Sequence, residues 1–209
     1  MSKPDLILIG AGGHAHACID VIEQHGGYQI IGLIGMPDEL HANHLGYEVI
    51  GTDKDLTQLV KTCPLALISV GQIQTPLHRI RLYQQVMQLG FQLPTIIAPS
   101  AYVSRHATLG VGTVVMHGAI VNAGARIGNN CIINTQALIE HDVTIADHCH
   151  ISTGAILNGS TTIQTGCFVG SGALLKEGIS VGESCVLGLG LIVRHNQPDH
   201  TKMIRSTQS

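Results

Sequence analysis

A six-residue periodicity in the second half of the chain constrains the fold more than any other feature of the sequence. From Ile97 to Val193, every sixth residue is isoleucine, valine or leucine, without an insertion. A small residue such as Ala119 or Ala137 follows most of these positions by four, and Gly, Asn and Asp are concentrated between them. A fixed period of this kind is typical of architectures in which each repeat packs on its neighbours.

The repeat predicts a triangular prism of parallel strands. Alternate residues of a strand point to opposite faces, so the aliphatic residue and the small residue two positions before it both point inward. The turn-forming residues place a corner at the end of every hexad, and three hexads make one coil. The cysteines support this length, because four of them recur at every third hexad: Cys131, Cys149, Cys167 and Cys185. We expect them to stack as small buried side chains.

Residues 1–95 have a different pattern, which predicts a small α/β domain. The expected strands lie near Leu6–Ile9, Gln29–Ile34 and Leu65–Ser69, and the expected helices cover His16–Gln24 and Leu77–Leu89. Such alternation is typical of a parallel sheet with flanking helices. The repeat domain is expected over residues 96–196, followed by a C-terminal tail over residues 197–209.

A glycine-rich turn follows the first expected strand. Gly10, Gly12 and Ala15 match the GxGxxG/A pattern, in which backbone amides approach a diphosphate at a helix N-terminus. The dinucleotide fingerprint also expects an acidic residue at the end of the second strand, where Gly35 stands instead. We therefore favour the diphosphate of a nucleotide sugar as the ligand over NAD. The alternative is a tight strand-to-helix turn without a ligand.

Composition excludes several other classes of protein. The net charge of -3 and the pI near 6.5 give no basic surface for nucleic acid. No apolar run reaches the length of a membrane span. The six cysteines contain no CxxC pair, and no secretory leader precedes the first strand. We therefore expect a cytoplasmic protein with reduced thiols that binds neither nucleic acid nor a membrane.

These features together resemble the bacterial hexapeptide-repeat sugar acetyltransferases, such as UDP-4-amino-sugar and perosamine N-acetyltransferases and sialic acid O-acetyltransferases. The resemblance is carried by the glycine turn ending in His14 and by the segments Asn134-Thr135, Ile139–Asp142 and Cys149–Ser152. It implies an N-terminal Rossmann-like α/β domain followed by an all-β left-handed parallel β-helix. It also implies acetyl-CoA as co-substrate, a nucleotide-linked sugar as substrate, no metal, and a homotrimer with active sites between subunits.

The resemblance assigns roles to particular residues. His141 is expected to be the general base that takes a proton from the acceptor, with Asp142 as its supporting acid. Glu140, which also flanks His141, leaves the identity of that acid open. The residues expected to bind acetyl-CoA are Asn134, His150, Gly159, Gly170, Ser171, Gly188 and Leu189. Those expected to bind the nucleotide sugar are Gly12, Gly13, His14 and Arg79.

The coil length makes a geometric prediction about these residues. His141 and His150 are separated by half a coil, so they lie on different sides of one prism. Asn134 and His150 are separated by nearly a full coil and return to nearly the same corner. A site that uses His141 together with His150 therefore closes between two subunits, and a cyclic assembly of three is the natural solution.

The sequence departs from the family pattern in two places and leaves three other functions open. Gly35 leaves the nucleotide unidentified, and Gln197–Lys202 replaces the Gly-Val-Pro-Ala-Lys-like ending that contacts CoA. The alternatives are O-acetylation of a sialic-acid-type sugar, a non-catalytic scaffold or sugar-nucleotide-binding protein, and a γ-class carbonic anhydrase. The histidine spacing does not match the last of these. N-acetylation is favoured because a nucleotide-binding domain suits the precursor of an activated amino sugar for glycan synthesis.

Overall fold

The computed structural model of the chain describes residues 2–204, which form two compact units. The first unit comprises residues 2–71 and 78–99, and the second comprises residues 72–77 and 100–204. The predicted boundaries at 95 and 196 stay predictions, and part of the predicted tail, 205–209, lies outside the described residues. No helix within residues 2–204 is long and apolar enough to span a membrane.

The first unit is built on a sheet of the order β3-β4-β2-β1-β5. The strands are β1 (Asp5–Ile9), β2 (Gln29–Ile34), β3 (Asn43–His44), β4 (Tyr47–Gly51) and β5 (Ala66–Ile68). All neighbouring pairs are parallel except β3 and β4, which are antiparallel. The helices are α1 (Gly13–His25), α2 (Leu56–Thr62) and α3 (Leu77–Leu89), with a 3-10 turn η1 (Pro37–Glu39) and the strand β6 (Ile96–Ile97).

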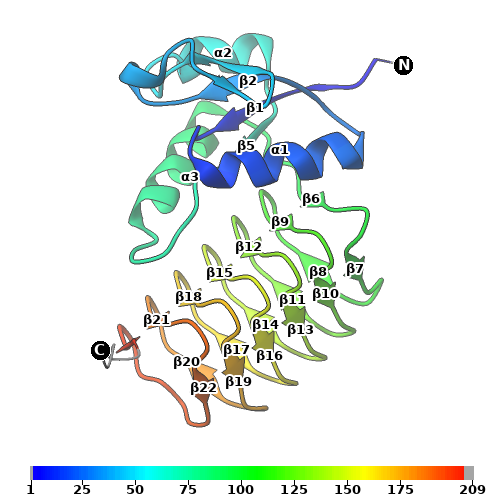
Figure 1. Cartoon of the computed structure of the whole chain (residues 1–209), viewed down its shortest axis with the longest axis vertical. Coiled ribbons are helices and arrows are strands. Elements are labelled where there is room, and N and C mark those ends of the chain that lie inside the picture. The colour runs from blue at the N-terminus through cyan, green and yellow to red at the C-terminus, as the bar shows by residue number, and fades with distance from the viewer. Residues whose placement is uncertain (1, 205–209) are drawn as a thin grey trace. The chain divides into compact units, whose positions relative to one another are not determined.

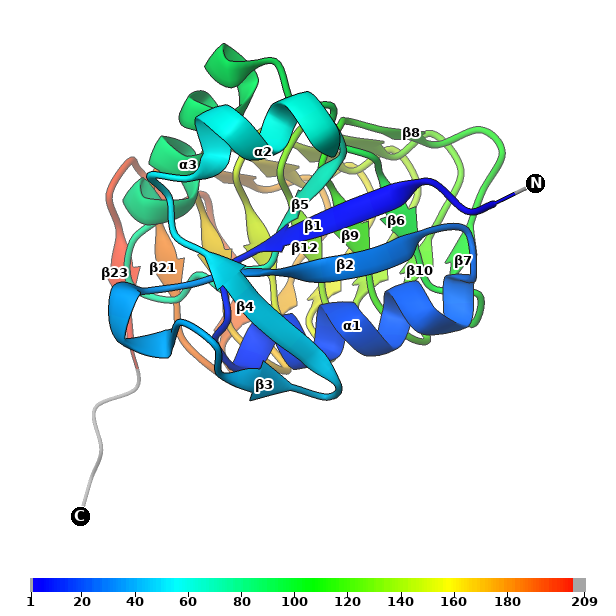
Figure 2. The same cartoon turned by 90° about the horizontal axis from the view of Figure 1, so that it is seen from above.

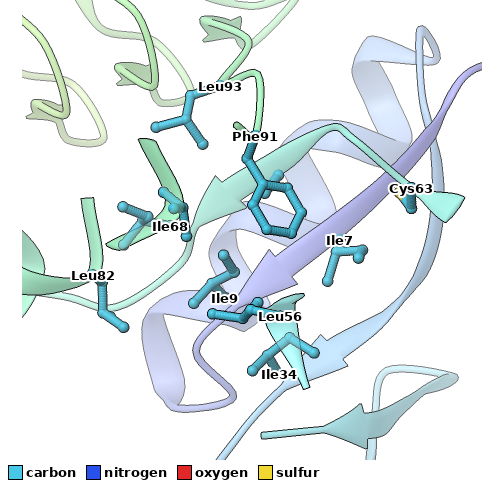
Figure 3. Close-up of a cluster of buried hydrophobic side chains, with 11 residues drawn as sticks. Ile7, Ile9, Ile34, Leu56, Cys63, Ile68, Leu82, Phe91 and Leu93 are labelled. Carbon is cyan, nitrogen blue, oxygen red and sulfur yellow. The ribbon is translucent and has the colours of Figure 1, made fainter. Parts of the chain in front are cut away.

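Helices cover both faces of this sheet, and α1 and α2 lie on opposite sides of it (Figures 1 and 2). Ile7 and Ile9 of β1 point to the face that carries α2 and α3, where Leu56 and Leu82 pack against them. Figure 3 shows this cluster closed by Phe91 from the segment after α3. Because both faces of β1 are buried, its sequence reads as a continuous apolar run, as is usual for a central parallel strand.

All five predicted strands and helices of this unit are present, with β1 starting one residue before its predicted range, whereas β3, β4, α2 and η1 were not predicted. The predicted bounds of β2 and α3 agree with the structure, and β5 lies within its predicted range. The helix α1 begins at Gly13, earlier than the predicted His16, because the glycine turn itself opens the helix. The short elements β3, β4 and α2 were missed; in α2 only Leu56 is buried, which leaves no periodic signal.

The second unit is the predicted prism, with three walls of parallel strands (Figure 1). The first wall contains β7 (Tyr102–Val103), β10 (Ile120–Val121), β13 (Leu138–Ile139), β16 (Ile156–Leu157), β19 (Leu174–Leu175) and β22 (Ile192–Val193). The second wall contains β8 (Thr108–Leu109), β11 (Arg126–Ile127), β14 (Thr144–Ile145), β17 (Thr162–Ile163) and β20 (Ser180–Val181). The third contains β9 (Val114–Val115), β12 (Ile132–Ile133), β15 (His150–Ile151), β18 (Phe168–Val169), β21 (Val186–Leu187) and β23 (Lys202–Met203).

The register confirms the predicted coil length. Ile120 pairs with Leu138, and Ile132 pairs with His150, so each strand meets the strand three hexads further along the chain. The last step is shorter, because Val186 pairs with Lys202, two positions short of a full coil. The chain beyond Val193 therefore adds a shortened coil rather than leaving the prism at once.

The interior of the prism has the predicted composition. The inward aliphatic residues from Val115 to Val193 are at most 4 % exposed. The stacked cysteines are all free and buried between the second and third walls. Burial raises the pKa of the Cys149 thiol well above its usual value, whereas the hydrogen bond with Cys149 lowers the pKa of Cys167. Because all four cysteines are completely buried, we interpret the column as packing.

The corners depend on residues in the left-handed backbone conformation. Every sixth residue from Gly112 to Gly190 has a positive φ, and most of these residues are glycine. Glycine adopts this conformation without a steric penalty, and Asn and Asp tolerate it better than most other residues. Asp142 is one of the exceptions to glycine, with a φ of 60°. The corner that carries Asp142 therefore needs a residue that adopts the left-handed conformation, and in this chain that residue also supplies a carboxylate.

Candidate functional site

His141 and Asp142 form a histidine–carboxylate pair at the corner between β13 of the first wall and β14 of the second. Nδ1 of His141 lies 2.9 Å from Oδ2 of Asp142. A carboxylate only accepts, so Nδ1–H of the neutral ring donates to it and Nε2 keeps its lone pair. The two side chains are 64 % and 66 % exposed. The pair is thus oriented as a general base requires, with most of the imidazole side chain exposed outside the prism.

Glu140, the other acid beside His141, is oriented differently. Its Oε2 accepts from Nδ2 of Asn122 at 3.1 Å and from the backbone N–H of His141 at 3.2 Å. The structure therefore brings Asp142, rather than Glu140, to the imidazole ring.

Gly159 lies beside the His141 ring, one coil further along the chain at the same corner. An ideal Cβ on Gly159 would lie 2.7 Å from both Cε1 and Nε2 of His141, closer than a real Cβ approaches another atom. The missing side chain therefore lets the ring lie against the backbone. Sequence reasoning assigned Gly159 to acetyl-CoA and missed this contact, although the spacing of one coil was the available signal.

Asn134 and His150 form a second polar group, where the third wall meets the first. Nδ1–H of His150 donates to the backbone carbonyl of Gln72 at 2.6 Å. Oδ1 of Asn134 accepts from the N–H of Thr135 at 2.8 Å, which turns the amide nitrogen of Asn134 toward Nε2 of His150 at 3.0 Å. With its Nδ1 proton fixed in this way, neutral His150 accepts at Nε2.

A pocket of about 570 Å³ lies on the third wall beside this group. Its lining contains the predicted residues His150, Gly170, Ser171, Gly188 and Leu189. Gly170 is required there, because a Cβ would lie 2.5 Å from the backbone carbon of Gly188. The predicted residues Asn134 and Gly159 do not line the pocket.

The remaining lining residues were not predicted from the sequence. They are Ile73, Gln74, Ser152, Phe168, Val186 and Ile204. Phe168 packs edge-on against His150, with ring centroids 5.2 Å apart. Phe168 and Val186 occupy the outward position of the third wall. An apolar residue in such a position was the sequence feature that could have predicted the pocket. Ile73 and Gln74 come from the segment 72–77, which no repeat pattern predicts.

In the first unit, the glycine-rich turn has the geometry of an anion-binding loop. Gly10 has a φ of 116°, and a Cβ on it would lie 2.4 Å from Cγ2 of Val70, so only glycine fits. Gly12 is the N-cap of α1 and has no side-chain capping bond. Nothing lies within 4 Å of an ideal Cβ on Gly12 or Gly13. Backbone amides at such a helix start are suited to a phosphate, next to His14.

Arg79 is buried beside this turn, and its exposed fraction is only 1 %. Its guanidinium donates to the carbonyl of Ile68 at 3.2 Å and also to that of Val70. These bonds fix the backbone at the end of β5, which lies at the same edge of the sheet as the glycine turn. We therefore expect Arg79 to position the backbone near the nucleotide sugar rather than to contact it.

Within residues 2–204, no three His, Cys, Asp or Glu side chains gather closely enough to hold a metal ion. The predicted residues instead form three groups: the pair at His141 with Gly159, the Asn134–His150 group beside the pocket, and the glycine turn with Arg79. In one chain, the first wall separates the His141 corner from the Asn134 corner.

A β-helix that carries such a histidine–carboxylate corner and a narrow apolar pocket defines a transferase of the hexapeptide-repeat class. Residues 124–159 match the family of bacterial transferase hexapeptides, and residues 5–86 match the PglD N-terminal domain. No curated protein sequence matches the chain.

Solved structures give a closer comparison over nearly the whole chain. A variant of perosamine N-acetyltransferase from Caulobacter crescentus, in complex with CoA and GDP-perosamine, is 30 % identical, with a TM-score of 0.90. The comparison covers 97 % of this chain and 94 % of that one. The acetyltransferase domain of PglB from Neisseria gonorrhoeae, in complex with acetyl coenzyme A, is 31 % identical, with a TM-score of 0.89 and 97 % of both chains covered.

A third structure shares the fold alone. WeeI from Acinetobacter baumannii is 18 % identical, with a TM-score of 0.82 over 96 % of both chains. The chain belongs to the bacterial hexapeptide-repeat sugar acetyltransferases, and it is an acetyltransferase. The predicted fold class, an α/β domain followed by a left-handed parallel β-helix, is confirmed.

Proposed function

We propose that the protein transfers an acetyl group from acetyl-CoA to the amino group of a nucleotide-linked sugar, as a step in glycan precursor synthesis. The observation that carries this proposal is the exposed His141–Asp142 pair, in which Asp142 accepts from Nδ1–H and leaves Nε2 of the neutral ring unprotonated. Relatives 30 % and 31 % identical to the chain bind CoA with GDP-perosamine, or acetyl coenzyme A.

His141 acts as the general base in this proposal. As the amine attacks the thioester carbonyl, a C–N bond forms, and Nε2 of His141 takes the proton that the amine loses. The C–S bond then breaks, and the CoA sulfur leaves with its electron pair and is protonated by the imidazolium. Asp142 holds the ring in the required tautomer and stabilises the imidazolium that forms.

Asn134 is the better donor to the carbonyl oxygen of the thioester. The resemblance made His150 a candidate for that role, but Nδ1–H of His150 donates to Gln72 and its Nε2 accepts from Asn134. Neutral His150 has no second proton to donate. The amide of Asn134 has two N–H groups, so one remains for the developing oxyanion while His150 orients the amide and lines the pocket.

The outward side chains of the prism support a trimer with active sites between subunits. On the first wall, all are apolar or aromatic: Tyr102, Ile120, Leu138, Ile156, Leu174 and Ile192. On the second wall, all are polar: Thr108, Arg126, Thr144, Thr162 and Ser180. An apolar face of this length is typical of a protein interface. The first wall has the Asn134 corner along one edge and the His141 corner along the other. When the first walls of neighbouring subunits pack around a threefold axis, the His141 edge of one subunit meets the Asn134 edge of the next.

Matched charge substitutions test the interface. We expect Ile156→Arg on the first wall to yield monomers and to abolish activity, because the arginine is buried without a partner. Thr162→Arg on the second wall should leave both the mass and the activity unchanged. Light scattering measures the mass, and equal behaviour of the two variants would contradict the proposed interface.

The reaction is tested by incubating the protein with acetyl-CoA and a panel of UDP- and GDP-linked amino sugars, while free thiol release is measured. Thiol release that depends on an amino sugar supports the proposal, and mass spectrometry of the product identifies the acetylated atom. Acetylation of a hydroxyl would favour the alternative of a sialic-acid-type O-acetyltransferase. A protein that fails to bind acetyl-CoA would be a scaffold.

A further inference from the structure

The sequence lacks the acidic residue expected at the end of β2, but the fold brings another acid to that place. The position after β2 is Gly35, and an ideal Cβ on Gly35 would lie 2.8 Å from Oε2 of Glu39. The Glu39 carboxylate therefore occupies the space into which a side chain at position 35 would extend. A side chain at position 35 and the present Glu39 rotamer therefore exclude each other, and in this chain the space is filled by the carboxylate of Glu39.

This carboxylate lies next to the glycine-rich turn. Ile9 and Ile34 are paired in the sheet, and the N–H of Gly10 donates to the carbonyl of Ile34 at 2.8 Å, so β1 and β2 end side by side. The Cβ of Ala11 lies 3.3 Å from the same ideal Cβ of Gly35. Glu39 and the turn that is suited to a diphosphate thus flank one spot at the carboxyl edge of the sheet.

Only one oxygen of Glu39 has a structural role in the described contacts. Oε2 accepts from the backbone N–H of Met36 at 2.8 Å and so caps the turn η1. A carboxylate has two oxygens and about four acceptor sites, so Oε1 keeps its capacity to accept. In dinucleotide-binding α/β folds, an acid that follows the second strand accepts from the hydroxyls of the ribose whose diphosphate lies at the glycine turn.

We infer that Glu39 binds the ribose hydroxyls of the nucleotide, in place of the acid that the sequence lacks at position 35. Met36, with 63 % of its surface exposed in the same turn, lies where it offers an apolar contact to the nucleoside. The inference rests on the proposed function, because it takes the ligand of the glycine turn to be a nucleotide.

Calorimetric titration of the full chain with UDP and GDP, and with their 2′-deoxy counterparts, tests this role without acetyl transfer. Glu39→Gln keeps an oxygen that caps Met36 but loses the charge and one acceptor. We expect it to weaken binding of the preferred ribonucleotide about ten- to hundredfold and to remove the preference over the 2′-deoxy form. Asp38→Asn, an exposed acid of the same turn, is the matched control and should bind like the natural protein.

A swap of the two positions gives a second test. The φ of Gly35 is not positive, and once Glu39 is removed the nearest atom to an ideal Cβ there is Cγ1 of Val49 at 3.0 Å, which a small shift of that side chain relieves. We expect Glu39→Ala to weaken binding as Glu39→Gln does, and Gly35→Asp combined with Glu39→Ala to recover most of it. If the natural protein binds UDP or GDP while Glu39→Gln binds equally well and the deoxy forms are not discriminated, the role of Glu39 is wrong and the proposed function stands. If neither nucleotide binds the natural protein, both are overturned.

Discussion

Three corners of the prism carry a histidine beside an aspartate, at His141–Asp142, Asp147–His148 and Asp199–His200, and the first two differ in what their side chains contact. At the first corner, Nδ1 of His141 faces the carboxylate of Asp142. At the next corner, Asp147 accepts from the backbone N–H and the side-chain amide of Asn129, at 2.7 and 3.2 Å, while Nδ1 of His148 lies 3.0 Å from the amide nitrogen of Asn130.

The difference shows that residues one coil away along the prism determine which hydrogen bonds each histidine–aspartate pair can make. At the second corner, the asparagines one coil earlier bind both side chains and hold adjacent coils together. At the first corner, the residue one coil later is Gly159, which has no side chain to compete for the ring. The same residue types therefore form hydrogen bonds between coils at one corner and an exposed histidine–aspartate pair at the other.

The same substitution at both histidines tests this difference most strongly. We expect His141→Asn to lower kcat by roughly 10²–10⁴, because the general base is lost, with the oligomer unchanged. His148→Asn is the control, since asparagine tolerates the positive φ of 61° at that position and leaves the base intact. Steady-state thiol release measures both, and equal losses would show that the corners are not functionally distinct.

Replacing the two aspartates is expected to have a smaller effect. Asp142→Asn keeps the left-handed backbone but removes the charge that stabilises the imidazolium. Because the pair is exposed, we expect kcat/KM to fall only about tenfold, less than in buried triads. Asp147→Asn should leave kcat/KM unchanged. A normal rate for Asp142→Asn, measured at saturating acetyl-CoA, would remove Asp142 from the mechanism.

Gly159→Ala probes the space beside the base. The added Cβ displaces the His141 ring, and we expect kcat to fall about fivefold to tenfold because the base is misplaced. In a double-mutant cycle, the alanine should have no further effect in the His141→Asn background. An additive loss would mean that Gly159 acts through acetyl-CoA rather than through His141.

The prism would be difficult to misread from its sequence, because every coil repeats the same physical requirements. Val121, Ile139 and Leu157 are inward at intervals of one coil because each pairs with the next, and the positive-φ corner recurs between them. In the first unit, β3 and α2 bury few side chains, so their sequences carry no comparable signal.

The six-residue repeat predicted where the residues of the candidate site lie along the prism, but not how their side chains are oriented. The corner of His141 followed from the repeat and the family resemblance, but the choice between Asp142 and Glu140 depends on side-chain orientation. The bond from His150 to Gln72 joins residues 78 positions apart. The position of the Glu39 carboxylate beside Gly35 likewise depends on the turn η1, whose start is marked by Pro37 but which was not predicted.

The smallest effect is expected at the cysteine column behind the second corner. Cys149→Ala removes one buried sulfur, and we expect a loss of about 1 kcal/mol in the free energy of unfolding with normal kcat. Because all six cysteines are buried, iodoacetamide should not label the folded protein, and the raised pKa of Cys149 further disfavours its thiolate. Loss of activity without loss of stability would give the column a role beyond packing.

Mixing two inactive variants tests most directly whether the active site lies between subunits. His141→Ala and Asn134→Ala should each be inactive or nearly so as pure oligomers, because each lacks one half of every site. After unfolding and refolding together in equal amounts, about a quarter of the sites should combine an intact His141 with an intact Asn134 from a neighbour. We therefore predict that activity returns to about a quarter of the natural level, whereas no recovery would contradict a site built from two subunits.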